Sequence, residues 1–186
     1  FAMVMVVMIP VRRIYGLEEY ITDYHLENMS RFILFTSNIC GYAYAMEYFI
    51  AWYSGVEFEQ TSFWLRAFGP YWISTWCMII FNVVFPQLLW FKKLRTNIPF
   101  LFVLCFFINI GMWFERYVII ITSLSREFIP AAWGLYIPSL AELSVLTGSF
   151  CWFSMFFILF LKGGPIIAIV EVKELIIHEK AHGGAH

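Results

Sequence analysis

The chain has 186 residues, of which 61% are hydrophobic, 21% aromatic and only 13% charged, and its formal net charge is -1. Soluble domains are roughly 45–50% apolar and about 25% charged, so this composition excludes an ordinary soluble domain and indicates a chain surrounded by lipid. No basic face or nucleic-acid motif is present, and we expect no nucleic-acid partner.

The N-terminal segment 1–9, FAMVMVVMI, is apolar and lacks a beginning, so we expect it to be the end of a truncated transmembrane helix. A cytoplasmic connection is predicted over 10–29. Four apolar windows follow, each near the ~20 residues that cross ~30 Å of hydrocarbon, at 30–53, 69–91, 99–121 and 139–161. Continuous apolar runs without strand-type alternation predict helices. The expected fold is an all-α transmembrane helix bundle with four full spans over 30–161 and a polar cytoplasmic tail over 162–186.

Lysine and arginine alternate in number between the predicted connections. The connections 10–31 and 92–98 and the tail contain three each, whereas 54–68 and 122–138 contain one each. Because these residues accumulate on the cytoplasmic side of a membrane, the three richer segments are predicted to be cytoplasmic and the other two external. The C-terminus is then cytoplasmic.

The cysteines and histidines do not indicate a metal or haem site. The four cysteines fall one to a span, unlike the clustered ligands of an iron–sulfur centre, at Cys40, Cys77, Cys105 and Cys151. All four histidines lie outside the spans. His178 and His182 match the HExxH signature of zinc proteases, but only four residues follow and no third ligand is indicated. We expect a solvated tail, with no metal ligand and no catalytic residue in this chain.

Four ionisable residues lie where lipid is expected: Glu47, Glu115, Arg116 and Glu142. Such residues usually face the protein interior and mark proton, ion or substrate paths. The predicted topology puts all four in one layer of the outer leaflet, with Glu47 about 9 Å from the outer end of its span. Neighbouring residues on a helix point in different directions, so Arg116 is expected to pair with Glu47 or Glu142 rather than with Glu115.

One arginine cannot neutralise three acids, and a carboxyl group without a cation in lipid tends to take up a proton. A proton-transfer role for these four residues is therefore favoured over a purely structural clamp.

Two further sets of polar or small residues follow the same spans. One recurs at helical spacing and predicts a face that meets a neighbouring helix: Thr36, Cys40, Ala43, Glu47 and Ala51. The other lies nearer the midplane, as candidates either for a proton wire or for plain helix contacts: Asn38, Asn82 and Asn109.

Four stretches carry a resemblance to a known family. They are IPVRRIYGLEEYIT (9–22) with His25 behind it, GYAYAMEYFIAWYSG (41–55), RAFGPYW (66–72) and NIGMWFERYVIIITSLSREFIPAAWGLYIPS (109–139). Together they resemble the C-terminal half of the NrfD/PsrC-like integral membrane subunits, most specifically the ActC subunit of bacterial alternative complex III.

This resemblance implies a bundle in the bacterial inner membrane that binds no haem or metal itself. It implies menaquinol oxidation, with electrons passing to an iron–sulfur subunit and multihaem cytochrome c subunits on the outer face and protons released outside. Membrane lipid and a homologous NrfD-like membrane subunit are further expected partners. The family's quinol site belongs mainly to a first bundle that this sequence does not contain. The resemblance therefore implies a proton path, rather than the quinol ring, at Glu47, Glu115, Arg116 and Glu142.

Two other classes stay open. A secondary transporter would have a binding site near the midplane at broken helices, and Pro86 alone interrupts a predicted span. A passive anchor for electron-transfer subunits accounts for the aromatic outer connections but not for the buried acids. We expect a membrane subunit of a quinol oxidoreductase complex that is not active alone.

Overall fold

The computed structural model describes residues 1–125, 134 and 136–164, and every regular element in these ranges is helical. The α-helices are α1 (Ala2–Ile14), α2 (Asp23–Tyr53), α3 (Glu57–Phe68), α4 (Trp72–Ile79), α5 (Phe85–Gln87), α6 (Lys92–Arg95), α7 (Ile98–Ser125) and α8 (Leu140–Gly163). A π-helix, η1 (Ile80–Val84), and a 3-10 helix, η2 (Leu88–Trp90), interrupt the series. The all-α prediction is confirmed. The HExxH match and the predicted tail beyond residue 164 lie outside the described residues.

Three helical segments are long and apolar enough to cross a membrane, which makes the chain an α-helical membrane protein. They are Trp72–Trp90, Ile98–Ser125 and Leu140–Gly163, with mean hydropathy 1.5, 1.9 and 1.9, and they correspond to three of the four predicted spans. The fourth, 30–53, lies within the unbroken 31-residue helix α2, which is not among the three apolar segments. At ~1.5 Å per residue α2 is long enough to span, but the count of four full spans stays a prediction.

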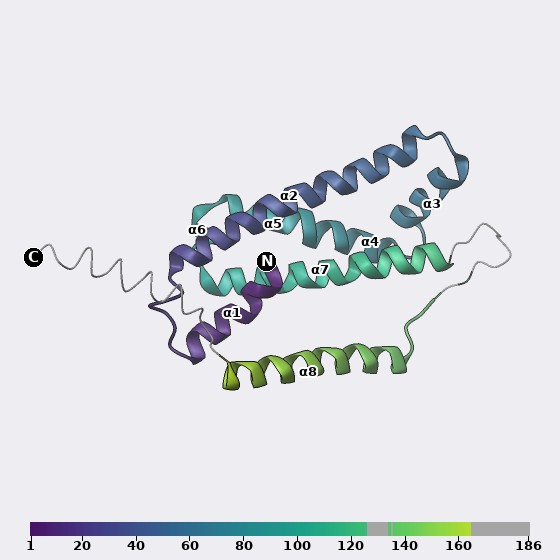
Figure 1. Ribbon diagram of the computed structural model, residues 1–186. Helices are drawn as coiled ribbons and strands as arrows, with labels where there is room; N and C mark the ends of the chain where they lie inside the picture. The colour runs from purple at the N-terminus through teal and green to yellow at the C-terminus, as the bar shows by residue number, and fades with distance from the viewer. Residues whose placement is uncertain (126–133, 135, 165–186) are drawn as a thin grey trace, which may run out of the picture. The chain divides into compact units, whose positions relative to one another are not determined.

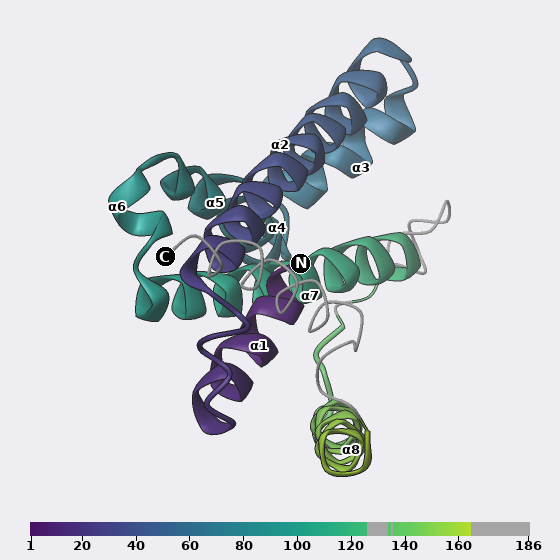
Figure 2. The same ribbon diagram turned by 60° about the vertical axis from the view of Figure 1, so that its left-hand side comes forward.

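The chain divides into two compact units, Phe1–Tyr136 and Ile137–His186. In the first unit α1 packs on α7, and the α4–η2 segment lies between α2 and α7 (Figures 1 and 2). The first unit includes α1 and ends before α8, and the four-helix bundle over 30–161 stays a prediction. Helix α1 also continues past the predicted boundary at residue 9, through Pro10 to Ile14.

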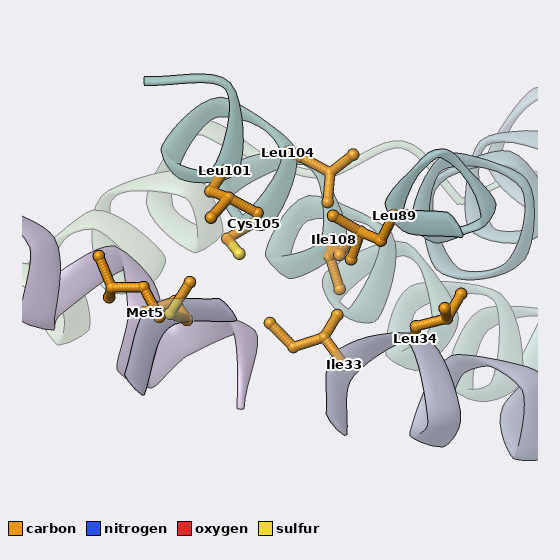
Figure 3. Close-up of a cluster of buried hydrophobic side chains, with 9 residues drawn as sticks. Met5, Ile33, Leu34, Leu89, Leu101, Leu104, Cys105 and Ile108 are labelled. Carbon is orange, nitrogen blue, oxygen red and sulfur yellow. The ribbon is translucent and has the colours of Figure 1, made fainter. Parts of the chain in front are cut away.

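The core of the first unit explains why α1 belongs to it. Nine buried side chains from α1, α2, η2 and α7 form one cluster (Figure 3): Met5, Leu26, Ile33, Leu34, Leu89, Leu101, Leu104, Cys105 and Ile108. On α7 the buried positions continue beyond this cluster at Gly111, Val118 and Thr122, at spacings of three, seven and four residues. Such spacing defines one face of a helix. Glu115 lies on this face, between Gly111 and Val118.

Charged side chains join the two predicted cytoplasmic connections at one end of the first unit. Glu27 Oε1 accepts hydrogen bonds from Arg95 Nη2 at 2.8 Å and from Arg31 Nη2 at 2.9 Å. Arg12 Nη2 lies 2.8 Å from Asp23 Oδ1 and ties the end of α1 to the start of α2. This end holds α6, whereas α3 lies at the other end (Figure 1). The connections that were predicted to share a side of the membrane therefore lie together.

Glu27 gives a prediction on stability. The hydrogen bond from Arg95 holds the pKa of the Glu27 carboxyl below its usual range, with a smaller contribution from Arg31. A carboxyl group with a lowered folded-state pKa stabilises the fold above its unfolded value of about 4.3 and loses that effect as pH falls through the folded value. We expect Glu27→Gln to lower the Tm at neutral pH and to converge with the native protein in acid, measured by thermal unfolding in detergent. Glu19→Gln, at an exposed position, is the control. A Tm difference that persisted in acid would contradict the assignment.

Candidate functional site

The Trp72–Trp90 segment is broken by a π-helix near its middle. Helix α4 ends at Ile79, and η1 occupies Ile80–Val84 just before Pro86. Proline has no amide hydrogen and cannot bond the carbonyl four residues earlier, here that of Asn82. The widened turn carries Asn82 into the interior, where the residue is 3% exposed. Single π-turns inside α-helices occur frequently at functional sites.

Helix α2 supplies polar groups to this break. The Ser37 hydroxyl donates a hydrogen bond to the Asn82 carbonyl, which is the carbonyl that Pro86 leaves without its usual donor. Gln87 Nε2 donates to the Val83 carbonyl at 3.1 Å and to Asn38 Oδ1 at 3.1 Å. Within a membrane, backbone groups freed by proline must be satisfied by neighbouring side chains. The break is therefore an organised feature that fixes α2 against η1 and α5.

Glu115 lies at the centre of a partly buried polar cluster. Tyr44 Oη on α2 donates to Glu115 Oε2 at 2.7 Å. Asn82 Nδ2 on η1 donates to Tyr44 Oη at 3.1 Å and to Glu115 Oε2 at 3.4 Å. Within the described ranges no lysine or arginine forms an ion pair with Glu115. Three helical segments thus converge on one acid through neutral donors.

Gly111 allows α7 to approach this cluster. A Cβ atom at Gly111 would lie 2.3 Å from Asn82 Oδ1 and 2.7 Å from Phe81 Cβ. Asn82 Oδ1 is buried and has no hydrogen-bond partner among the described atoms. A side chain at position 111 would therefore push η1 away from α7 and separate Asn82 from Glu115.

Substitution at this contact tests the packing. We expect Gly111→Ala to destabilise the protein by about 1–3 kcal/mol, the usual cost of forcing an extra methyl into a packed interior. Gly41→Ala is the matched comparison, because its Cβ would meet only the Val83 side chain, at 3.0 Å, and its cost should be smaller. The measurement is reversible unfolding in mixed detergent micelles. An equal loss in both variants would show that the α7–η1 contact is not special.

A double-mutant cycle tests the link between Ser37 and Pro86. Ser37→Ala should cost about 1–3 kcal/mol, because it leaves a buried carbonyl with one donor fewer. In a Pro86→Ala background, where residue 86 regains its amide hydrogen, the same change should cost less. Additive losses would contradict the assignment of Ser37 as the donor that replaces the missing amide.

A second polar cluster lies at the α3 end of the unit and centres on Arg66. Its Nη1 lies 3.0 Å from Glu47 Oε1 on α2, and its Nε donates to Thr122 Oγ1 on α7 at 3.0 Å. The guanidinium carbon also lies 4.8 Å from the centre of the Phe63 ring. Arg66 therefore joins α3 to both long helices.

The predicted site residues separate into different environments. Glu115 and Asn82 come together, whereas Glu47 pairs with Arg66 instead of Arg116. Arg116 is exposed, and no acid pairs with it in the part of the chain that the structure describes. It borders a groove of about 590 Å³ with Trp113 and Tyr117.

Glu142 lies in the second unit, where it caps α8. Its Oε2 accepts from the Ser139 backbone amide at 2.7 Å, and its own amide donates to Ser139 Oγ at 3.3 Å.

The remaining asparagines make separate contacts. Asn38 bonds Gln87, and Asn109 Nδ2 donates to the Cys105 carbonyl at 2.9 Å within α7. These bonds do not connect the three asparagines into one chain.

The predicted contact face of α2 differs from the structure in its middle part, whereas Thr36, Cys40 and Ala51 are buried or half-buried. Ala43 and Glu47 are exposed, and the buried or half-buried series is Ser37, Gly41, Tyr44, Tyr48 and Ala51. Small residues and Glu47 guided the prediction, but a tyrosine fills the space beside Glu115 better than an alanine and supplies a hydroxyl. Tyr44 and Arg66 were missed for this reason, although the tyrosine spacing along the span carries the same helical period.

Comparison with known protein families finds none that matches the chain, and comparison with characterised proteins finds no significant similarity. The described structure itself defines the class: an α-helical membrane protein with a half-buried carboxyl group that meets neutral hydrogen-bond donors.

Proposed function

We propose that this chain is a membrane subunit of a quinol-oxidising respiratory complex of the alternative complex III type, and that it contributes a transmembrane proton path. The observation that supports the proposal is the bonding of Glu115, whose carboxyl group meets Tyr44 and Asn82 inside a membrane unit without a cation. Ionisable residues in this setting are expensive and usually functional.

The chemistry of the cluster suits proton transfer. A carboxyl group can hold a proton at Oε2, and the Tyr44 hydroxyl, 2.7 Å away, can accept and donate in the same step. The Asn82 amide can donate to either oxygen and so holds the pair in position when the proton moves. Oxidation of a quinol releases protons together with electrons, and this path would carry protons toward the end that holds Glu47.

The proposed setting is the bacterial inner membrane, with the Arg95 end of the first unit on the cytoplasmic side. Electrons would pass to an iron–sulfur subunit and multihaem cytochrome c subunits on the outer face, beside a homologous NrfD-like membrane subunit. Menaquinol would be oxidised within the same complex. The chain would also anchor these peripheral subunits.

A secondary transporter is the second candidate, because the Trp72–Trp90 span is interrupted by π- and 3-10 segments. Transporters place their binding sites at such breaks near the midplane. Purification in mild detergent separates the two classes. Co-purifying haem c and iron–sulfur absorbance supports the redox subunit, whereas a colourless chain that purifies alone supports the transporter.

Glu115→Gln is the direct test of the proton path. The amide keeps the shape and hydrogen-bonding capacity of the side chain, so the complex should assemble at normal yield. Proton release coupled to quinol oxidation should slow about a hundredfold, as for loss of one positioned proton-transfer group. The measurement is proton release per electron in reconstituted vesicles. Glu59→Gln is the control, since Glu59 is exposed on α3 and bonds a serine hydroxyl. Normal rate and stoichiometry in Glu115→Gln would favour the passive anchor.

A further inference from the structure

Arg66 occupies a position that the proton path, as proposed above, must pass. The α2 and α7 helices run in the same direction from the Arg95–Glu27 end of the unit toward α3 (Figure 1). Thr122 follows Glu115 by seven residues on α7, two turns farther along the same face, or about 10 Å. Glu47 follows Tyr44 by three residues on α2. The Arg66 guanidinium therefore bridges α2 and α7 from α3, at a level between Glu115 and the α3 end.

The two partners of this ion pair differ in their access to solvent. The Arg66 side chain is 19% exposed and the Glu47 side chain 47%. The arginine is additionally held by Thr122, whose hydroxyl donates to the Val118 carbonyl at 2.6 Å, and by the Phe63 ring. The cation is thus held by three contacts, while the carboxylate beside it is about half-exposed.

We propose that Arg66 is a positioning residue that gates the outer end of the proton path, with Glu47 as the acid that opens and closes it. This proposal rests on the proton-path function of Glu115. In the closed state the Glu47 carboxylate pairs with Arg66, and the fixed positive charge repels a proton that approaches from outside.

The gating step is a proton exchange between two carboxyl groups. The Glu115 carboxyl gives up its proton and becomes a carboxylate, and the Glu47 carboxylate receives that proton and becomes neutral. The neutral acid no longer attracts Arg66, and a half-exposed ion pair of this kind opens at little cost. Glu47 then releases its proton to water on its exposed side, and the ion pair forms again. No bond other than the O–H bonds changes, and no electron is transferred.

The test uses the whole complex in sealed vesicles with a pH-sensitive dye. Two quantities are measured: the passive proton leak under an imposed pH gradient without quinol, and proton release during turnover. We expect Arg66→Gln to raise the passive leak on the order of tenfold, since removing a charged hydrogen-bond donor typically changes an equilibrium by at least that factor. Arg66→Lys retains the charge beside Glu47 and should restore most of the native resistance. Arg31→Gln, which alters an ion pair at the opposite end of α2, should leave the leak unchanged.

The outcomes separate the gate from the path. A native leak in Arg66→Gln, together with slowed release in Glu115→Gln, overturns the gate and leaves the path. Normal release in Glu115→Gln overturns both. Equal leaks in Arg66→Gln and Arg66→Lys show that the charge is irrelevant and also overturn the gate. If Arg66→Gln does not assemble, Thr122→Val removes one of the two bonds that hold the arginine and should raise the leak by about threefold. A native leak in that variant overturns the proposal.

Discussion

The missing amide hydrogen of Pro86 is the constraint from which the polar interior follows. A proline in a membrane helix leaves the carbonyl four residues earlier without its usual donor, and here that carbonyl belongs to Asn82. The π-turn at Ile80–Val84 and the Ser37 hydroxyl are the local response. Both bring α2 against the broken helix, and the same turn directs the Asn82 side chain toward α7. A backbone irregularity thereby supports the half-buried acid Glu115.

The second requirement is that α2 and α7 lie close to η1, and this explains the glycines near the π-turn. A methyl group at position 111 would collide with Asn82, and one at position 41 would meet Val83. Small residues at helix contacts allow backbones to come close in lipid, where apolar burial gives no drive for association. Polar bonds from Tyr44 and Asn82 to Glu115 then add directional contacts at the place where the helices are nearest. Packing and polar chemistry are therefore coupled at this level of the unit.

The helices could be predicted from the sequence more fully than the contacts between their side chains. The helical class, the long segments and the grouping of positive connections at one end of the first unit follow from hydropathy and charge counts, because lipid imposes the same requirements on any chain. The contact face of α2 does not follow. The helical spacing of the contact residues is visible in the sequence. Which of the possible faces turns inward depends on the bond from Tyr44 to Glu115 on α7, and no local sequence pattern encodes that bond. The pairing of Glu47 with Arg66 was missed likewise, since α3 lies in a segment expected to be a plain connection.

The neighbouring residues Glu115 and Arg116 show how a single helix separates two charges. Successive side chains on a helix do not face each other, so the acid falls on the buried face of α7 and the base on its exposed side. Glu115 instead bonds the neutral donors Tyr44 and Asn82, and the ion pair of Glu47 with Arg66 lies closer to the α3 end. Helix geometry thus assigns the acid to the contacts around Asn82 and the base to the groove beside Trp113 and Tyr117.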